Sequence, residues 1–254
     1  MEVSMLQEME RKMNPIQIEL EKVSFGYEKE RQVLHDISFT ARENESIGLI
    51  GANGMGKSTL LKLLVGLETG YQGKIYMKDM AVVPKMMAEI REKIGYIFQD
   101  SENQLFMTNV YDEIAFAPRN YGFQEEEVKI RVEAALEQIK ITHLKEKQIY
   151  KLSGGEKKLV SIATVLAMTP DIILMDEPTI ALDPKNRRNL IGILNQLSSM
   201  KIIASHDLDM IMDTCTRVIL IYNGKLIRDG STDEILTDKK LLEEHGLELP
   251  LRLQ

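Results

Sequence analysis

The stretch Gly51-Ala52-Asn53-Gly54-Met55-Gly56-Lys57-Ser58-Thr59 decides how this chain folds. It fits the phosphate-binding pattern G-x-x-x-x-G-K-[ST]. An apolar run at residues 47–50 precedes it and a run of helical character follows at residues 60–64, which predicts a strand, a loop and a helix in that order. In this arrangement backbone N–H groups at the helix N-terminus converge on a polyphosphate. The sequence therefore predicts a binding site for a nucleoside triphosphate.

A second stretch, residues 172–177, supplies acidic groups that such a site can use. Four apolar residues predict a buried strand, and Asp176 and Glu177 follow at its end. We expect Lys57 to reach the β- and γ-phosphates and the Ser58 hydroxyl to bind Mg²⁺. Asp176 is then placed near the metal, and Glu177 is the candidate general base for a water on the γ-phosphate.

The composition is that of an ordinary soluble globular protein. Of the 254 residues, 44% are hydrophobic and 28% are charged, and no apolar run is long enough to cross a bilayer. Residues 1–13 lack the apolar core of a signal peptide. The single cysteine, Cys215, excludes an internal disulfide, fits a reducing cytoplasm and predicts a small buried residue. The net charge of −7 argues weakly against nucleic-acid binding, so we expect no nucleic-acid partner.

The order of the expected elements indicates an α/β fold. Short β-rich runs precede the glycine loop, and helices alternate with buried strands after it, which predicts a mostly parallel core with an antiparallel appendage. Residues 109–168 have helical character throughout. The pair Ser231 and Glu234 has the spacing of a capping box and predicts the start of a short helix. One predicted helix face is apolar and comprises Val128, Val132, Ala135, Leu136 and Ile139.

Further motifs follow one another in the order of a known family. The segment Leu-Ser-Gly-Gly-Glu occupies residues 152–156, and Ser153 lies 96 positions after Lys57. With these motifs the chain resembles the ATPases of ATP-binding-cassette (ABC) systems from about residue 16 to residue 236. The other residues that match family motifs are the adenine-stacking Tyr27, Gln99 of the loop that senses Mg²⁺ and the membrane partner, Asp183 of the D-loop and the switch histidine His206.

The resemblance implies a P-loop NTPase fold of ABC type. In that fold a mostly parallel core sheet carries an antiparallel β subdomain and an inserted helical subdomain, expected here at about residues 100–168. The ATPase domain is expected at residues 16–236, with an N-terminal extension at residues 1–15 and a C-terminal tail at residues 237–254. The implied activity is hydrolysis of ATP, with ATP and Mg²⁺ as cofactors.

The family's site residues carry over position by position. The expected ATP-binding residues are Tyr27, Gly51, Asn53, Gly54, Gly56, Lys57, Ser58 and Thr59. The expected catalytic residues are Glu177, His206, Lys57 and Gln99. The expected Mg²⁺ ligands are Ser58, Gln99 and Asp176. In the family the signature acts on ATP bound to a second subunit, so Ser153, Gly154, Gly155, Glu156 and the D-loop residue Asp183 imply a dimer, either of two copies or with a paralogue.

Three positions depart from the family pattern. Met55 stands where a small residue is usual, and its side chain points either into solvent or towards the nucleotide. Glu156 replaces a commoner Gln, and Leu159 stands where Arg is frequent, which puts in doubt an ion pair from that position. None of the three removes a catalytic group.

The region after Gln99 indicates a subclass. Residues 98–106 and 110–122 resemble the ATPases of energy-coupling-factor importers, which take up vitamins or ions such as cobalt and nickel. The tail at residues 244–250 resembles the cobalt/nickel branch. The implied protein is a peripheral subunit at the cytoplasmic face of the cell membrane. Its implied partners are a second ATPase subunit, a transmembrane coupling protein and a membrane substrate-binding component.

The acidic loop after Gln99 is the candidate groove for a helix of the coupling protein. Asp100, Glu102 and Gln104 are the expected contacts, because acids there can pair with basic residues of a partner. A solvated acidic loop is the alternative. Two other functions also remain open: a soluble single-cassette ATPase of the iron–sulfur assembly type, and an ATPase of another ABC transporter branch. The sequence does not identify the solute or a purpose for residues 1–15.

Overall fold

The structure, a computed structural model, describes residues 15–28 and 31–254. These residues form two compact units, each described here by itself. Unit 1 comprises the described residues up to Ile94 together with Ser198–Gln254, and unit 2 comprises Gly95–Leu197. All but the last residue of the expected N-terminal extension, residues 1–15, lies outside the described part.

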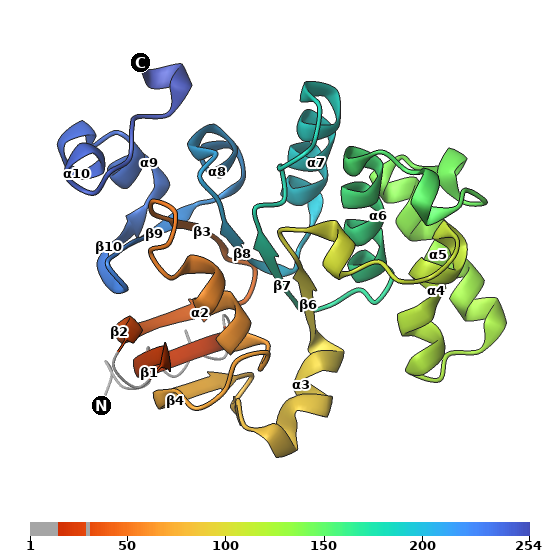
Figure 1. Cartoon of the computed structure of the whole chain (residues 1–254), viewed down its shortest axis with the longest axis horizontal. Coiled ribbons are helices and arrows are strands. Elements are labelled where there is room, and N and C mark those ends of the chain that lie inside the picture. The colour runs from red at the N-terminus through yellow and green to blue at the C-terminus, as the bar shows by residue number, and fades with distance from the viewer. Residues whose placement is uncertain (1–14, 29–30) are drawn as a thin grey trace, which may run out of the picture. The chain divides into compact units, whose positions relative to one another are not determined.

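An antiparallel sheet occupies the N-terminal part of unit 1. Its strand order is β2 (Arg31–Arg42), β1 (Ile16–Glu28), β4 (Gln72–Met77) and β5 (Met80–Ala81). Figure 1 shows β1, β2 and β4 side by side. Ile18 and Leu20 of β1 are buried and point to the core, while Glu19 between them is half-buried. The predicted antiparallel β subdomain is therefore present.

The strands that lead to the glycine loop are parallel and fully buried. β3 (Ser46–Ile50) lies between β8 (Met200–Ala204) and β9 (Arg217–Tyr222) and is parallel to both, while β10 (Lys225–Ser231) pairs antiparallel with β9. Every residue of β3 and β8 is buried, as expected for parallel strands that are covered on both faces. A Cβ on Gly48 would lie 2.5 Å from Ile211, so helix α8 (Leu208–Thr214) packs directly on β3.

Helices complete unit 1. α2 (Lys57–Leu64) follows the glycine loop, and the 3₁₀ turn η1 (Pro84–Met86) leads into α3 (Met87–Lys93). α8 (Leu208–Thr214), α9 (Thr232–Leu236), α10 (Lys239–Glu244) and the 3₁₀ turn η5 (Leu251–Leu253) lie in the C-terminal part. Ser231 caps α9 by accepting a hydrogen bond from the Glu234 N–H, which confirms the predicted helix start. Cys215 is buried, as predicted, and burial raises the pKa of its thiol.

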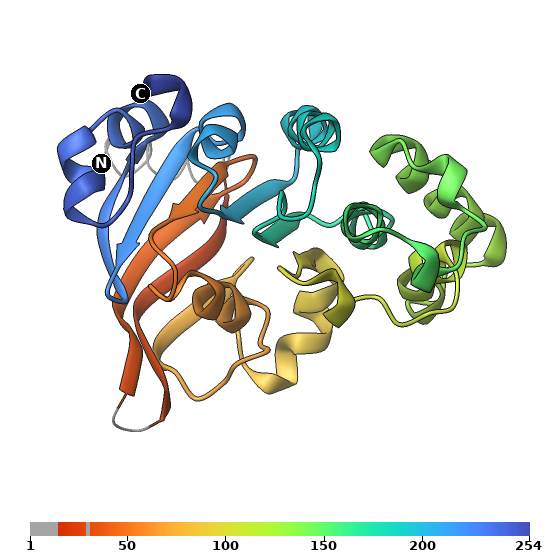
Figure 2. The same cartoon turned by 45° about the horizontal axis from the view of Figure 1, so that its top comes forward.

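Unit 2 contains the inserted helices. Its strands β6 (Ile94–Ile97) and β7 (Ile172–Asp176) are neighbours, and its helices are α4 (Val110–Asn120), α5 (Glu125–Ile139), α6 (Gly154–Leu166) and α7 (Pro184–Gln196). Figure 2, in which α6 is viewed nearly along its axis, shows α4 and α5 beside it. The buried residues of α5 are Val128, Val132, Ala135, Leu136 and Ile139, which confirms the predicted apolar face.

The prediction of continuous helical character over residues 109–168 is wrong in one segment. Lys140 adopts a left-handed conformation, with φ of 62°, and ends α5. Only the short 3₁₀ turns η3 (Thr142–Leu144) and η4 (Ile149–Lys151) lie between α5 and α6, and a third turn, η2 (Ser101–Asn103), precedes α4. Within the described residues, no helix combines the length and apolarity needed to span a membrane.

Candidate active site

The glycine loop has a backbone shape that only glycine adopts without strain. Gly51, Gly54 and Gly56 have φ values of 150°, 79° and 103°. A Cβ on Gly51 would lie 2.3 Å from the Ile221 carbonyl oxygen, and one on Gly56 would lie 2.7 Å from the Leu34 side chain. Gly56 is also the N-cap of α2 and has no side chain to cap it. The first N–H groups of α2 are therefore available to an anion such as a phosphate.

Lys57 is held against this loop. Its side chain is buried, and its Nζ donates hydrogen bonds to the carbonyl oxygens of Gly51 at 2.6 Å and Ala52 at 3.1 Å. A cation beside a helix N-terminus that is rich in N–H groups gives the loop a local positive potential, which favours a polyphosphate. The loop therefore has the donors and the charge that its sequence pattern predicts.

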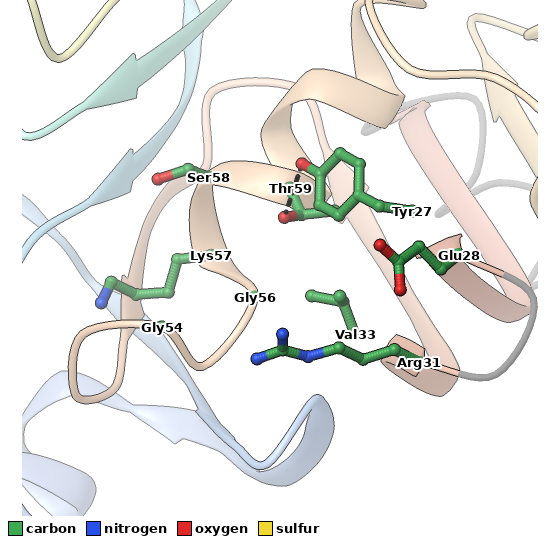
Figure 3. Close-up of a pocket in the computed structure, with 9 residues that line it drawn as sticks. All are labelled: Tyr27, Glu28, Arg31, Val33, Gly54, Gly56, Lys57, Ser58 and Thr59. Atoms are coloured by element: carbon green, nitrogen blue, oxygen red, sulfur yellow. Dashed lines mark hydrogen bonds between the residues drawn. The ribbon is translucent and has the colours of Figure 1, made fainter.

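A cavity of about 370 Å³ adjoins the loop in unit 1. Figure 3 shows its lining residues, which are Tyr27, Glu28, Arg31, Val33, Gly54, Gly56, Lys57, Ser58 and Thr59. The Tyr27 hydroxyl and Thr59 Oγ1 are 3.2 Å apart and hydrogen-bonded, while 55% of Tyr27 is exposed. The Lys57 and Ser58 side chains point away from Tyr27, so the loop offers a phosphate end and an aromatic end for a base. Glu28 and Arg31, which also line the cavity, belong to no recognisable motif.

His206 lies on the same side of unit 1 as the glycine loop. β3 and β8 are adjacent and parallel, so their carboxyl ends meet at one edge of the sheet. The glycine loop follows β3 at that edge, and the exposed His206 follows β8 there. Asp207 caps α8 by accepting a hydrogen bond from the Met210 N–H at 2.9 Å. The cap fixes the backbone immediately after His206.

The predicted acids and Gln99 come together in unit 2. Asp176 is the last residue of β7, Glu177 follows it, and both are buried. Glu177 has a φ of 48°, which is unusual for a residue with a side chain and marks a sharp turn after the strand. Gln99 follows β6 in an exposed loop.

Lys158, which sequence reasoning did not single out, connects these groups. Its Nζ donates hydrogen bonds of 2.8 Å to the carbonyl oxygens of both Phe98 and Gln99. Burial lowers the pKa of Lys158 to about 8, and the nearby carboxylates of Asp176, Asp100 and Glu177 oppose this shift. No sequence signal distinguishes Lys158 from its neighbour Lys157.

The signature segment forms the capped start of α6. Ser153 Oγ accepts a hydrogen bond from the Glu156 N–H, and Glu156 Oε2 accepts one of 2.7 Å from the Ser153 N–H. Glu156 also pairs with Lys147 at 2.9 Å. The Ser153 N–H and Lys147 lower the pKa of the Glu156 carboxyl. Glu is therefore well accommodated at a position where Gln is commoner, because a carboxylate at N3 completes a capping box.

The signature glycine Gly155 is packed against the D-loop. A Cβ on Gly155 would lie 2.9 Å from the carbonyl oxygen of Ala181, two residues before Asp183. Asp183 caps α7 by accepting hydrogen bonds from the N–H groups of Lys185 and Asn186, and these bonds lower its pKa. Unit 2 thus places the predicted signature and D-loop residues next to each other.

The structure shows where the side chains of Met55 and Leu159, two departures from the family pattern, lie. The Met55 sulfur lies 3.2 Å from the Asn223 backbone nitrogen, so the side chain points towards the turn between β9 and β10. Asn53, the remaining predicted loop residue, is exposed. Leu159 is buried in unit 2 and forms part of its core, where an arginine would need a partner for its charge.

Gln104, an expected contact of a partner helix, is hydrogen-bonded within unit 2. Its amide Nε2 donates to the Ser161 carbonyl oxygen at 2.7 Å and to Thr164 Oγ1 at 2.9 Å, and its Oε1 accepts from the Phe98 N–H. These bonds use the Gln104 amide to hold the loop against α6. Asp100 and Glu102 remain exposed.

A family model for the ABC transporter matches residues 34–180, more than half of the chain. The chain belongs to the ABC transporter family. An ABC transporter ATP-binding protein of Geobacter sulfurreducens is 44% identical over 93% of this chain and 95% of its own length. The energy-coupling factor transporter ATP-binding protein EcfA of Carboxydothermus hydrogenoformans is 37% identical over 92% of this chain and 87% of its own length.

A solved structure is similar over nearly the whole chain. CbiO1 of Clostridium perfringens, part of the ABC transporter complex cbiONQ, has a TM-score of 0.80 and 33% identity over 90% of this chain and 94% of its own. These comparisons confirm the predicted ABC-type P-loop NTPase fold, with its mixed parallel sheet, antiparallel β subdomain and helical subdomain. They also confirm the predicted activity: this ABC ATPase binds ATP and hydrolyses it.

Proposed function

We propose that this chain is the ATP-hydrolysing subunit of a membrane importer of the energy-coupling-factor type, at the cytoplasmic face of the membrane. The likeness to EcfA and to CbiO1 supports this subclass. Its cargo is then a cobalt or nickel ion or a vitamin, the two classes that the sequence resemblance implies. Specificity for one of them belongs to the membrane components.

The observation that carries the proposal is an exposed aromatic side chain, Phe106, after the Gln99 loop. Phe106 is 64% exposed and packs edge-on against Phe116 of α4, with ring centroids 4.7 Å apart. Glu113 is buried and accepts hydrogen bonds from the N–H groups of Phe106 at 2.9 Å and Met107 at 2.6 Å. The loop thus holds an apolar side chain in solvent, where an apolar face of a partner can cover it.

The charges near this pair favour one occupant, a basic amphipathic helix of a transmembrane coupling protein. Asp100 and Glu102 are exposed acids on the same loop. A helix with an apolar face can cover Phe106 while its lysines or arginines meet these acids, the helix-in-groove mode of recognition. Such acids steer a basic partner to the surface and fix its orientation.

We further propose that two ATPase subunits, identical or paralogous, form a dimer with two ATP sites, and that both subunits contribute residues to each site. The exposed N-terminus of α6, with Ser153 and Gly154, faces solvent in this chain and has N–H groups that attract an anion. Gly155 of this segment lies against Ala181 and Leu182, which directly precede Asp183, and this suits an interface in which both segments meet the second subunit. The signature then contacts ATP that is bound to the glycine loop of the partner.

The proposed mechanism assigns a task to each predicted residue. Lys57 and the N–H groups of α2 bind the phosphates, and Tyr27 stacks on the adenine. Glu177 orients and deprotonates the attacking water, and His206 donates to the γ-phosphate. Gln99 contacts the site from its loop. Catalysis consists of positioning and charge stabilisation, with no covalent intermediate on the protein.

We also propose that a Mg²⁺ ion is bound jointly by protein side chains and the nucleotide. Among the described residues there is no cluster of three or more His, Cys, Asp or Glu side chains that could hold a metal by itself. Mg²⁺ characteristically uses one or two protein ligands together with phosphate oxygens and waters. Ser58 and Asp176, with Gln99, would hold it, and when bound it offsets the charge of the β- and γ-phosphates.

Co-purification from membranes tests the proposal. Phe106→Ser should abolish recovery of transmembrane polypeptides with the tagged protein, because it removes the exposed apolar contact. Ile130→Ser is the matched control, since Ile130 is 61% exposed in the same unit but lies on α5 and not on the loop that carries Phe106. We expect it to retain the membrane partners. Equal recovery with both variants, or recovery of soluble scaffold proteins alone, would contradict the proposal and favour the single-cassette assembly ATPase.

A further inference from the structure

A buried lysine connects the signature helix to the loop that carries Gln99. Lys158 lies in the second turn of α6 and is 1% exposed. Its Nζ lies 2.8 Å from the carbonyl oxygens of Phe98 and Gln99, within unit 2. The backbone of a predicted catalytic residue is therefore bonded directly to the helix whose first residues are the signature.

The environment of Lys158 is unfavourable for an ordinary structural lysine. Removing an ammonium group from water is costly unless it is paired and hydrogen-bonded. Here two carbonyl oxygens accept from it, and the carboxylates of Asp176, Asp100 and Glu177 lie near enough to favour its charged form. A buried apolar residue would fill this space without the cost of burying a charge. The presence of a lysine at position 158 is thus better explained by its hydrogen bonds to the carbonyl oxygens of Phe98 and Gln99 than by packing.

The other contacts between this loop and α6 do not reach Gln99. Lys157 forms an ion pair of 2.6 Å with Glu102, which is 71% exposed at its side chain. Gln104 bonds to Ser161 and Thr164 further along α6. Gln104 also accepts a hydrogen bond from the Phe98 N–H, so without Lys158 the loop would keep that bond and lose the two bonds that hold the carbonyl oxygens of Phe98 and Gln99 to α6.

We propose that Lys158 is a positioning residue for ATP hydrolysis, which fixes the Gln99 backbone to α6 so that Gln99 and the signature move together. Lys158 touches neither the nucleotide nor the attacking water and acts only through Gln99 and its loop. The inference rests on the ATPase activity of the chain and not on the proposed importer. It is therefore tested with the purified full chain, without membrane components.

The test compares neighbouring lysines on one helix. Lys158→Met removes the donors and the charge while keeping an unbranched side chain that suits a buried site. Lys157→Met removes the ion pair with Glu102 and serves as the matched control. Lys158→Gln keeps an N–H donor without the charge. For each variant, kcat and KM for ATP are measured, together with hydrogen exchange of the backbone amides at residues 98–104.

The proposal predicts a selective loss in turnover. Lys158→Met should lower kcat by about tenfold with KM for ATP changed by less than about threefold, since nucleotide binding uses the glycine loop. Amide exchange at residues 98–104 should become faster. The kcat of Lys158→Gln should be about threefold higher than that of Lys158→Met, because the glutamine side chain can still donate to one carbonyl oxygen. Lys157→Met should leave kcat within about twofold of the wild-type value.

Two results would overturn the proposal. The first is a folded Lys158→Met variant with wild-type kcat, or with lower kcat but unchanged exchange at residues 98–104. The second is an equal loss in Lys157→Met. If Lys158→Met does not fold, Lys158→Gln decides alone: lower kcat with faster exchange supports the positioning role, and wild-type exchange contradicts it.

Discussion

Units 1 and 2 present their predicted site residues in different ways. In unit 1 the phosphate loop is defined by its backbone, since three glycines adopt positive φ angles and two of them lie too close to neighbouring atoms for a Cβ. In unit 2 side chains define the predicted site: two buried acids at the end of β7, a capping box at the start of α6 and a buried lysine bonded to the Gln99 loop. The glycine loop of unit 1 suits the binding of phosphate groups. The side chains of unit 2 suit the hydrolysis of ATP and its regulation.

The largest expected effect separates these two tasks. Glu177→Gln in unit 2 should lower kcat by about a hundredfold to ten-thousandfold, the usual contribution of a general base. Because the substitution leaves the glycine loop unchanged, the dissociation constant for ATP should stay close to the wild-type value. Steady-state turnover and fluorescent-nucleotide titration measure the two quantities. Wild-type turnover in Glu177→Gln would show that Glu177 is not the general base. Loss of ATP binding would show that binding does not depend on unit 1 alone.

The converse change is in unit 1. Gly56→Ala should weaken ATP binding by about tenfold to hundredfold, because a side chain at φ of 103° costs about 1–3 kcal/mol and its Cβ would lie 2.7 Å from Leu34. Gly192→Ala is the control: its Cβ would meet no atom within 4 Å, and it lies within α7. Alanine there should raise the free energy of unfolding by up to about 1 kcal/mol and leave binding unchanged. Unaltered ATP affinity in Gly56→Ala would contradict the backbone-defined site.

A smaller effect is expected at the aromatic end of the cavity. Tyr27→Ala should weaken ATP binding by about tenfold, since it removes a stacking surface that is worth roughly 1 kcal/mol beyond its area. Tyr27→Phe keeps the ring and loses only the hydrogen bond to Thr59, so it should weaken binding by less than about threefold. Isothermal titration with ATP and GTP measures both. Equal losses in the two variants would show that the hydroxyl, not the ring, is the important group.

The smallest expected effect concerns the capping box in unit 2. The pKa of Glu156 is lowered in the folded state, so its stabilisation is complete above the unfolded pKa and is lost as the pH falls through the folded pKa. Glu156→Gln should therefore cost about 0.5–1 kcal/mol of stability at pH 7 and nothing below the folded pKa of Glu156. Urea unfolding at several pH values measures this difference. A cost that is independent of pH would show that the charge of Glu156 contributes nothing.

The contrast between the units also explains what the sequence could predict. The glycine loop, the buried parallel strands, the apolar face of α5 and the capping pair at Ser231 and Glu234 follow from local rules that connect residue type to backbone shape. In each case the residues that define the feature are close together in the chain. The fold class and the ATPase activity follow from these features and from the family motifs.

Side-chain contacts between distant segments could not be predicted in this way. Lys157 and Lys158 are identical neighbours, yet Lys157 pairs with the exposed Glu102 and Lys158 is buried against the Gln99 backbone. Which of the two lysines is buried depends on the rotation of α6 about its axis and on the packing of unit 2. The sequence pattern shows neither. The same reason accounts for Gln104, a polar loop residue whose amide is bonded to α6, and for the break in helical character after Lys140.

The central claim is that the signature of one chain acts on ATP held by the glycine loop of another. Lys57→Ala and Ser153→Arg should each inactivate the chain when it is tested alone. Mixing equal amounts should restore about a quarter of the wild-type ATPase rate, because half of randomly paired symmetric dimers are mixed and each mixed dimer has one intact site. A mixture as inactive as its components, in chains shown to exchange subunits, would contradict the claim.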